Sequence, residues 1–176
     1  MDNARLYARP QSLADVAAHS GTLAEFGSNL RDWQHEIQRG RIHSRNAFSQ
    51  RIAEAPELLS PRFEGGDVAD AYLAGYAEWL ADEAGIARPD WCSSGQRVAE
   101  RPWFASPLRG HLLVASPASF RQRQIFTIPE RVFTPRAGRP PVSEPRKRER
   151  ARLRQKAYRQ RIAKLVRTAR GDAVTR

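Results

Sequence analysis

The sequence predicts a mainly α protein, a compact helical bundle followed by a Pro-rich linker and a long basic C-terminal helix. Two observations support this fold class. Apolar residues recur at spacings of three and four from Leu23 to Ile37, which places them on one face of a helix. Helix-start sequences precede this stretch and an earlier one. A third observation concerns organisation, because nearly all the net charge lies in the last 41 of 176 residues.

The first two helices are predicted from their ends. Residues 12–15 read Ser-Leu-Ala-Asp, a typical helix start, and Gly21 is a typical helix end. Residues 22–25 read Thr-Leu-Ala-Glu, a capping box in which hydroxyl and carboxylate each accept from the other's backbone amide. The apolar stripe behind this box comprises Leu23, Phe26, Leu30, Trp33 and Ile37, and the helix should end near Arg39 and Gly40.

These two helices also admit a helix-turn-helix interpretation. Ala17 and Gly21 have the spacing that such units use at their turn. However, Thr22 and Gly27 stand where apolar residues are expected, so two capped helices joined through a glycine explain the residues as well.

Two further helices are predicted in the middle of the chain. One runs from Ser44 to Ala55 and is stopped by Pro56. The next begins at Asp67 as its cap and ends at Gly85, and it is apolar on more than one face, so we expect it to be the central helix. Asp67 and Asp70 lie at its start, where carboxylates suit the helix dipole, and this explains them better than a catalytic pair.

After Pro89 prolines are frequent, so short elements should alternate with loops. Residues 112–114 (Leu-Leu-Val) fit either a short buried strand or a helical turn. Ser116 and Pro117 open a predicted helix that continues to Ile125.

Charge divides the chain into two parts. Residues 136–176, called the basic segment below, hold 15 Lys and Arg against three acids, a net charge of +12. Residues 1–135 hold 15 Arg against 16 acids, a net charge of −1. We therefore predict a helical body (1–134), a linker rich in Pro, Gly and Arg (135–143) and a basic amphipathic helix with its tail (144–176). A cationic segment on a neutral body indicates a polyanionic partner, first of all nucleic acid.

The linker contains a short sequence of its own. Residues 135–141 read Pro-Arg-Ala-Gly-Arg-Pro-Pro and partly match an AT-hook, which lays arginines into a narrow A·T minor groove. Ala137 interrupts the usual Arg-Gly-Arg-Pro core, and the alternative is a stiff extended spacer.

The basic helix has an apolar stripe and cationic flanks. Residues 155–161 resemble the basic region of leucine-zipper factors, but Ala151 stands at the base-reading Asn position and no leucine heptads follow, so base-specific reading is not expected. Phosphate binding is the favoured use; docking on the body or on a protein, and adsorption to an anionic membrane, are the alternatives. The predicted nucleic-acid-binding residues are Arg136, Arg139, Arg146, Lys147, Arg148, Arg150, Arg152, Arg154, Lys156, Arg159, Arg161, Lys164 and Arg167.

The sequence offers little catalytic chemistry. His19, His35, His43 and His111 are scattered, and the single cysteine, Cys92, has no evident base nearby. No phosphate-binding glycine loop or metal-ligand spacing is present, so we expect no cofactor, no metal and no enzymatic activity. One cysteine, no apolar leader and no apolar run of membrane-spanning length predict a cytoplasmic protein.

Residues 67–130 resemble a bacterial protein family. The resemblance rests on Asp70 to Ala74, on Pro89-Asp90-Trp91, on Pro102-Trp103-Phe104 and on residues 116–126. Members of that family are antitoxins or regulators of two-gene modules whose other half is a nucleotidyltransferase-type toxin. The resemblance implies a non-enzymatic body that binds such a toxin and an appendage that binds DNA. The predicted partner-binding residues are Trp91, Trp103, Phe104, Phe120, Arg121, Arg123 and Phe126, with core packing as the alternative for each aromatic.

The sequence thus predicts a bacterial DNA-binding regulator with an antitoxin-like role. An RNA- or ribonucleoprotein-binding accessory protein is one alternative, since the same segment would bind A-form phosphates. A scaffold whose basic segment docks an acidic protein is another. DNA is favoured over RNA, and the operator and oligomeric state do not follow from the sequence.

Overall fold

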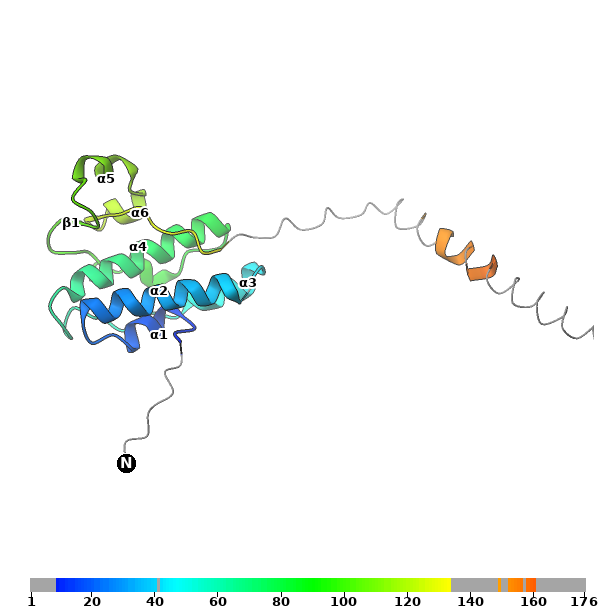
Figure 1. The fold of residues 1–176 in the computed structure, drawn as a ribbon, viewed down its shortest axis with the longest axis horizontal. Coiled ribbons are helices and arrows are strands. Elements are labelled where there is room, and N and C mark those ends of the chain that lie inside the picture. The colour runs from blue at the N-terminus through cyan, green and yellow to red at the C-terminus, as the bar shows by residue number, and fades with distance from the viewer. Residues whose placement is uncertain (1–8, 41, 134–148, 150–151, 157, 161–176) are drawn as a thin grey trace, which may run out of the picture. The chain divides into compact units, whose positions relative to one another are not determined.

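The structure is a computed structural model that describes residues 9–40, 42–133, 149, 152–156 and 158–160. The chain divides into two compact units, Met1–Arg136 and Ala137–Arg176. The first unit is mainly α, as predicted, with a single two-stranded sheet among its described residues (Figure 1). Its elements are α1 (Leu13–Ala18), α2 (Leu23–Arg39), α3 (Arg45–Ala53), α4 (Gly66–Ala84), η1 (Asp90–Ser93), β1 (Trp103–Phe104), α5 (Arg109–Ala115), α6 (Ala118–Arg121) and β2 (Ile125–Phe126).

Helices α1 and α2 begin at the predicted caps. The Ser12 hydroxyl accepts from the Asp15 amide, and the Asp15 carboxylate accepts from the Ser12 amide, which forms a complete capping box. At α2 the Thr22 hydroxyl accepts from the Glu25 amide, but the Glu25 carboxylate accepts from Gly21 instead of Thr22. One of the two hydrogen bonds of the predicted capping box therefore forms, and the Glu25 carboxylate satisfies the amide of Gly21, one residue before Thr22.

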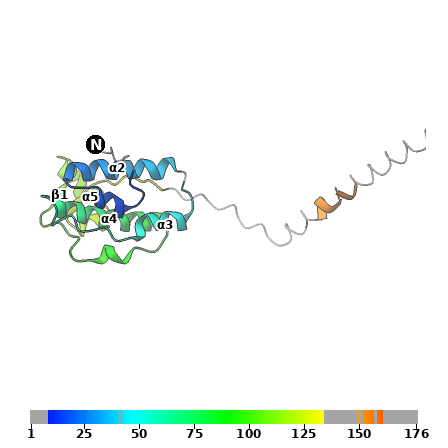
Figure 2. The same ribbon diagram turned by 90° about the horizontal axis from the view of Figure 1, so that it is seen from below.

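The stripe of α2 is buried except at its first residue. Phe26, Leu30, Trp33 and Ile37 are buried, whereas Leu23 is 38% exposed. Helix α1 contacts both α2 and α3 and lies between them (Figure 2).

Helix α4 is the central helix of the body, as its sequence predicted. It lies between the α1–α2 pair and α6 (Figure 1). Tyr76 is fully buried on it; its hydroxyl donates to the Glu130 carbonyl at 2.7 Å and accepts from the Gln34 amide at 3.0 Å. Phe133 stacks on Phe48 at 4.3 Å. Residues 130–133 are thereby fixed against both α4 and α3.

The start of α4 differs from the prediction. Gly65, at φ +80°, is the cap and Gly66 the first helical residue, so Asp67 lies inside the first turn. A Cβ on Gly66 would lie 2.1 Å from the Leu59 carbonyl oxygen, so only glycine fits this close approach. The Asp67 carboxylate instead accepts from the Glu100 amide at 2.9 Å.

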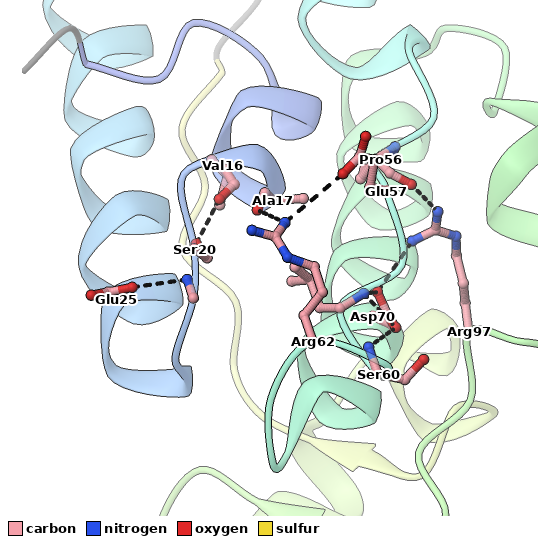
Figure 3. A network of polar contacts seen from close by, with 12 residues as sticks. Val16, Ala17, Ser20, Glu25, Pro56, Glu57, Ser60, Arg62, Asp70 and Arg97 are labelled. Carbon is pink, nitrogen blue, oxygen red and sulfur yellow. Dashed lines mark hydrogen bonds and ion pairs between the residues drawn. The ribbon is translucent and has the colours of Figure 1, made fainter.

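Asp70 is not a surface residue at a helix start but a buried residue that holds a loop. Its carboxylate accepts from the backbone amides of Leu59 and Ser60 at 2.9–3.0 Å, and Arg97 lies beside it (Figure 3). Arg97 also donates to the Pro56 carbonyl. Nearby, Arg62 donates to the Ala17 carbonyl at 3.0 Å and so ties the same loop to α1 (Figure 3).

The predicted helix from Ser116 to Ile125 is too long. Helix α6 ends at Arg121, and Gln124 has a φ of +60°, which turns the chain out of the helix. Ile125 and Phe126 then form β2, which pairs in parallel with Trp103 and Phe104 of β1. The sequence allowed either a strand or a helical turn for residues 112–114, and in the structure they lie in the helix α5.

Candidate functional site

The described part of the basic segment is helical and exposed. Residue 149 and residues 152–156 and 158–160 are helical, and the described side chains among them are exposed. Arg152, Lys156 and Arg159 follow one another at spacings of four and three, so they share one helix face. Like charges at this spacing repel one another, and an anionic ligand would relieve the repulsion.

Of the predicted nucleic-acid-binding residues, the structure describes Arg152, Arg154, Lys156 and Arg159. The others lie outside the described residues, and the partial AT-hook lies there too: Arg136, Arg139, Arg146, Lys147, Arg148, Arg150, Arg161, Lys164 and Arg167.

Three of the predicted partner-binding aromatics meet in space. Trp103 and Phe104 form β1 and pair with β2, so Phe126 lies beside them. The rings of Phe104 and Phe126 stack with centroids 4.6 Å apart and planes 13° apart. All three side chains are half-buried, and Arg121 is exposed. Phe104 and Phe126 form an accessible aromatic surface, whereas Trp103 lies opposite the buried Ile125 and packs against the core.

Three other predicted partner-binding residues serve the interior. Phe120 is fully buried against Tyr72 and Gly75, and Arg123 is 6% exposed, so neither side chain can reach a partner while the body is folded. Trp91 is half-buried; its indole N–H donates to the Ile52 carbonyl at 3.1 Å, and the Arg97 guanidinium lies 4.8 Å over its ring. Phe120 therefore packs in the core, which was the alternative to partner binding that the sequence left for each aromatic.

A polar cavity of about 360 Å³ lies beside α4. Glu78 lines it. The Glu78 carboxylate accepts from the guanidinium groups of Arg88 at 2.6 Å and Arg123 at 2.8 Å and from the side-chain amide of Gln122 at 3.0 Å. Arg123 also donates to the carbonyls of Ser119 and Cys92 at 2.6 and 2.7 Å. Sequence reasoning missed Glu78 and Arg88. The available signal was the pair Glu78 and Asp82, four residues apart on one helix face, since both bind Arg88.

The polar groups of this cavity hold one another. Both oxygens of Glu78 accept from cationic or amide donors, so the carboxylate is held in place by Arg88, Arg123 and Gln122. Cys92 lines the cavity, and burial raises the pKa of its thiol to about 12, which leaves it protonated and a poor nucleophile. The network instead joins α4, η1 and α6 through one buried carboxylate.

Across the ranges that the structure describes, no group of three His, Cys, Asp or Glu residues could hold a metal ion. No described helix has both the length and the apolar character to cross a membrane.

Comparisons with protein families, with curated proteins and with solved structures gave no match for this chain.

Proposed function

We propose that this protein binds nucleic acid, DNA in preference to RNA, through the basic segment. One observation supports this most strongly: residues 136–176 carry a net charge of +12, whereas the remaining 135 residues carry −1. Phosphate binding is driven by the release of condensed counterions, and it needs clustered and accessible Lys and Arg. Arg152, Lys156 and Arg159 meet both conditions, because they are exposed and share one helix face.

The body offers no comparable cationic surface on the helix that a helix-turn-helix would use. The exposed residues of α2 include Glu25 as well as Arg31 and Arg39, with Asp32 and Glu36 half-exposed between them. Such a face attracts phosphates weakly, because its charges of opposite sign cancel at the distance of a DNA backbone. This supports assigning nucleic-acid binding to the basic segment.

We further propose that the protein is a regulator with an antitoxin-like role and no enzymatic activity of its own. The support is the resemblance of residues 67–130 to antitoxins of nucleotidyltransferase-type toxins, together with the accessible aromatic surface of Phe104 and Phe126. The neighbouring gene tests this role: a nucleotidyltransferase-type product that co-purifies with this chain is expected. A neighbour of any other kind argues against the antitoxin role and leaves nucleic-acid binding intact.

Nucleic-acid binding is tested with the full chain and with a chain truncated after residue 135. Each is titrated with an A·T-rich duplex, a G·C-rich duplex and an RNA hairpin over a salt series. If six to eight phosphates are neutralised, the affinity of the full chain should fall about 10³- to 10⁴-fold between 50 and 200 mM salt. The truncated chain should not bind.

The other outcomes are equally informative. Preference for the A·T-rich duplex supports insertion of Arg136 and Arg139 into the minor groove. Tighter binding of the RNA hairpin favours the RNA-binding alternative. Equal binding by the truncated chain places recognition in the body, as a helix-turn-helix would. If neither chain binds, the proposal is wrong and the basic segment should be tested as a protein-docking element.

A further inference from the structure

Helix α5 exposes apolar side chains on the surface of the body. Leu112 is buried and anchors the helix, whereas Leu108 is 69%, Leu113 49% and Val114 82% exposed. Leu113 and Val114 are neighbours on a helix only about 10 Å long, so one partner segment can contact both. We call Leu113 and Val114 the α5 patch. Clustered exposed aliphatic side chains of this kind are typical of a surface that a partner covers.

A hollow of about 490 Å³ lies where β1 leads into α5. Trp103, Phe104 and Pro107 line it, and so does Arg109, the first residue of α5. Phe104 is fixed by its stack on Phe126, and the Arg109 guanidinium lies 5.2 Å over the Phe104 ring. The hollow therefore offers aromatic walls and a positioned cation, a combination that suits an apolar side chain next to a carboxylate.

The chain segment that contains the patch carries charge of one sign. Residues 101–129 contain four arginines and no Asp or Glu. Arg101, Arg109 and Arg121 are exposed. Arg123 is buried and is neutralised by Glu78. The first acids outside this stretch, Glu100 and Glu130, flank it on either side in the sequence. A complementary surface would thus carry carboxylates around an apolar centre.

We propose that the α5 patch and the adjoining hollow bind an acidic amphipathic segment of a partner protein. The segment's apolar side chains cover Leu113 and Val114 and enter the hollow, and its carboxylates pair with Arg109. The half-buried rings of Trp103 and Phe104 favour a protein over an anionic membrane, because membrane-inserting aromatic side chains protrude. This inference does not depend on nucleic-acid binding by the basic segment.

The first experiment places a photoreactive amino acid, p-benzoylphenylalanine, at Val114 of the full chain in the organism that encodes it. The control carries the same amino acid at Ala24, which is exposed on α2. After irradiation, mass spectrometry identifies the protein and the segment joined to position 114. The expected result is a product that the control lacks, joined at a segment with Asp and Glu around apolar residues at helical spacing.

The second experiment measures the affinity of the full chain for that segment as a synthetic peptide. Leu113→Asp and Arg109→Glu should each weaken binding about 10-fold or more, because each puts a like charge at the contact. The matched control is Leu23→Asp, which changes an exposed leucine on another helix and should alter affinity less than about 3-fold. Circular dichroism confirms the fold of each variant; Val114→Asp replaces any that unfolds.

Several results would overturn the inference. The inference is wrong if no crosslinked product is specific to position 114. It is also wrong if the partner segment joined to position 114 lacks acidic residues. Attachment to a second copy of this chain makes the patch a self-association surface instead. Attachment to lipid, or binding to vesicles of phosphatidylglycerol and phosphatidylcholine that Val114→Asp abolishes, makes it a membrane-binding surface. A chain that binds no DNA but yields the expected acidic segment leaves the inference intact.

Discussion

The carboxylate of Asp70 and the guanidinium of Arg97 form a buried ion pair, with Oδ1 and Nη1 3.7 Å apart. Burial lowers the pKa of Arg97, and the charge of Asp70 opposes this effect. Each partner also binds the backbone of the connection between α3 and α4: Asp70 at Leu59 and Ser60, Arg97 at Pro56. The pair therefore fixes the loop that leads into Gly66 and the central helix.

Removing one charge of this pair should destabilise the body strongly. Asp70→Asn leaves Arg97 buried without a counter-charge and weakens two backbone contacts, so we expect the free energy of unfolding to fall by about 3–5 kcal/mol in denaturant titration. The control is Asp82→Asn, which removes an exposed ion pair with Arg88 and should lower the free energy of unfolding far less. Equal losses for the two variants would show that the buried pair has no special role.

Two glycine-to-alanine substitutions in helices should have opposite effects. A Cβ on Gly66 would overlap the Leu59 carbonyl, so Gly66→Ala should lower the free energy of unfolding by about 1–3 kcal/mol or more. A Cβ on Gly27, an exposed residue inside α2, meets nothing within 4 Å, so Gly27→Ala should raise the free energy of unfolding by about 0.5–1 kcal/mol. Thermal unfolding of both variants checks the signs. A stable Gly66→Ala protein would refute the close approach at this helix start.

Cys92 should be inert in the folded protein. Its thiol pKa is raised from 9.0 to about 12 by burial, so at pH 9 the thiolate fraction is on the order of one in a thousand, against about half in the unfolded chain. We expect negligible labelling by iodoacetamide at pH 8–9 without denaturant and full labelling in it. Rapid labelling of the folded chain would contradict the burial of this thiol.

The same shift predicts a stability change with pH. Between the unfolded pKa near 9.0 and the folded pKa of about 12, the folded chain keeps a proton that the unfolded chain loses. The cysteine's contribution to stability is thus fully present below pH 9 and decreases as the pH rises through this window. Denaturant titrations of the parent chain and of Cys92→Ala from pH 8 to 11 should show a steeper decrease for the parent.

The basic helix should contribute a countable number of phosphate contacts. Arg152→Gln and Arg159→Gln should each make the slope of log affinity against log salt less negative by about 0.9, because each removes one counterion-releasing contact. Arg101→Gln, an exposed arginine of the body, is the control and should leave the slope unchanged. A control effect equal to that of the helix variants would mean that the body also binds phosphate.

The sequence by itself determined the local elements. The capping residues Ser12 and Thr22, the stripe from Phe26 to Ile37 and the end at Gly85 act within a few residues of chain, so the starts of α1 and α2 and the end of α4 could be predicted from them. The charge division also needs no tertiary structure, because it follows from counting.

Contacts between distant residues were decided only by the tertiary structure. Asp70 was expected at a helix dipole and is instead a buried anchor for residues 59 and 60 and for Arg97, since its position on α4 faces a loop. The parallel pairing of Trp103 with Ile125 ended the predicted helix of residues 116–125 early. Phe120 and Arg123 turned inward while Leu113 and Val114 stayed on the surface. Burial depends on what the folded chain places opposite each side chain, and residue type alone does not determine it.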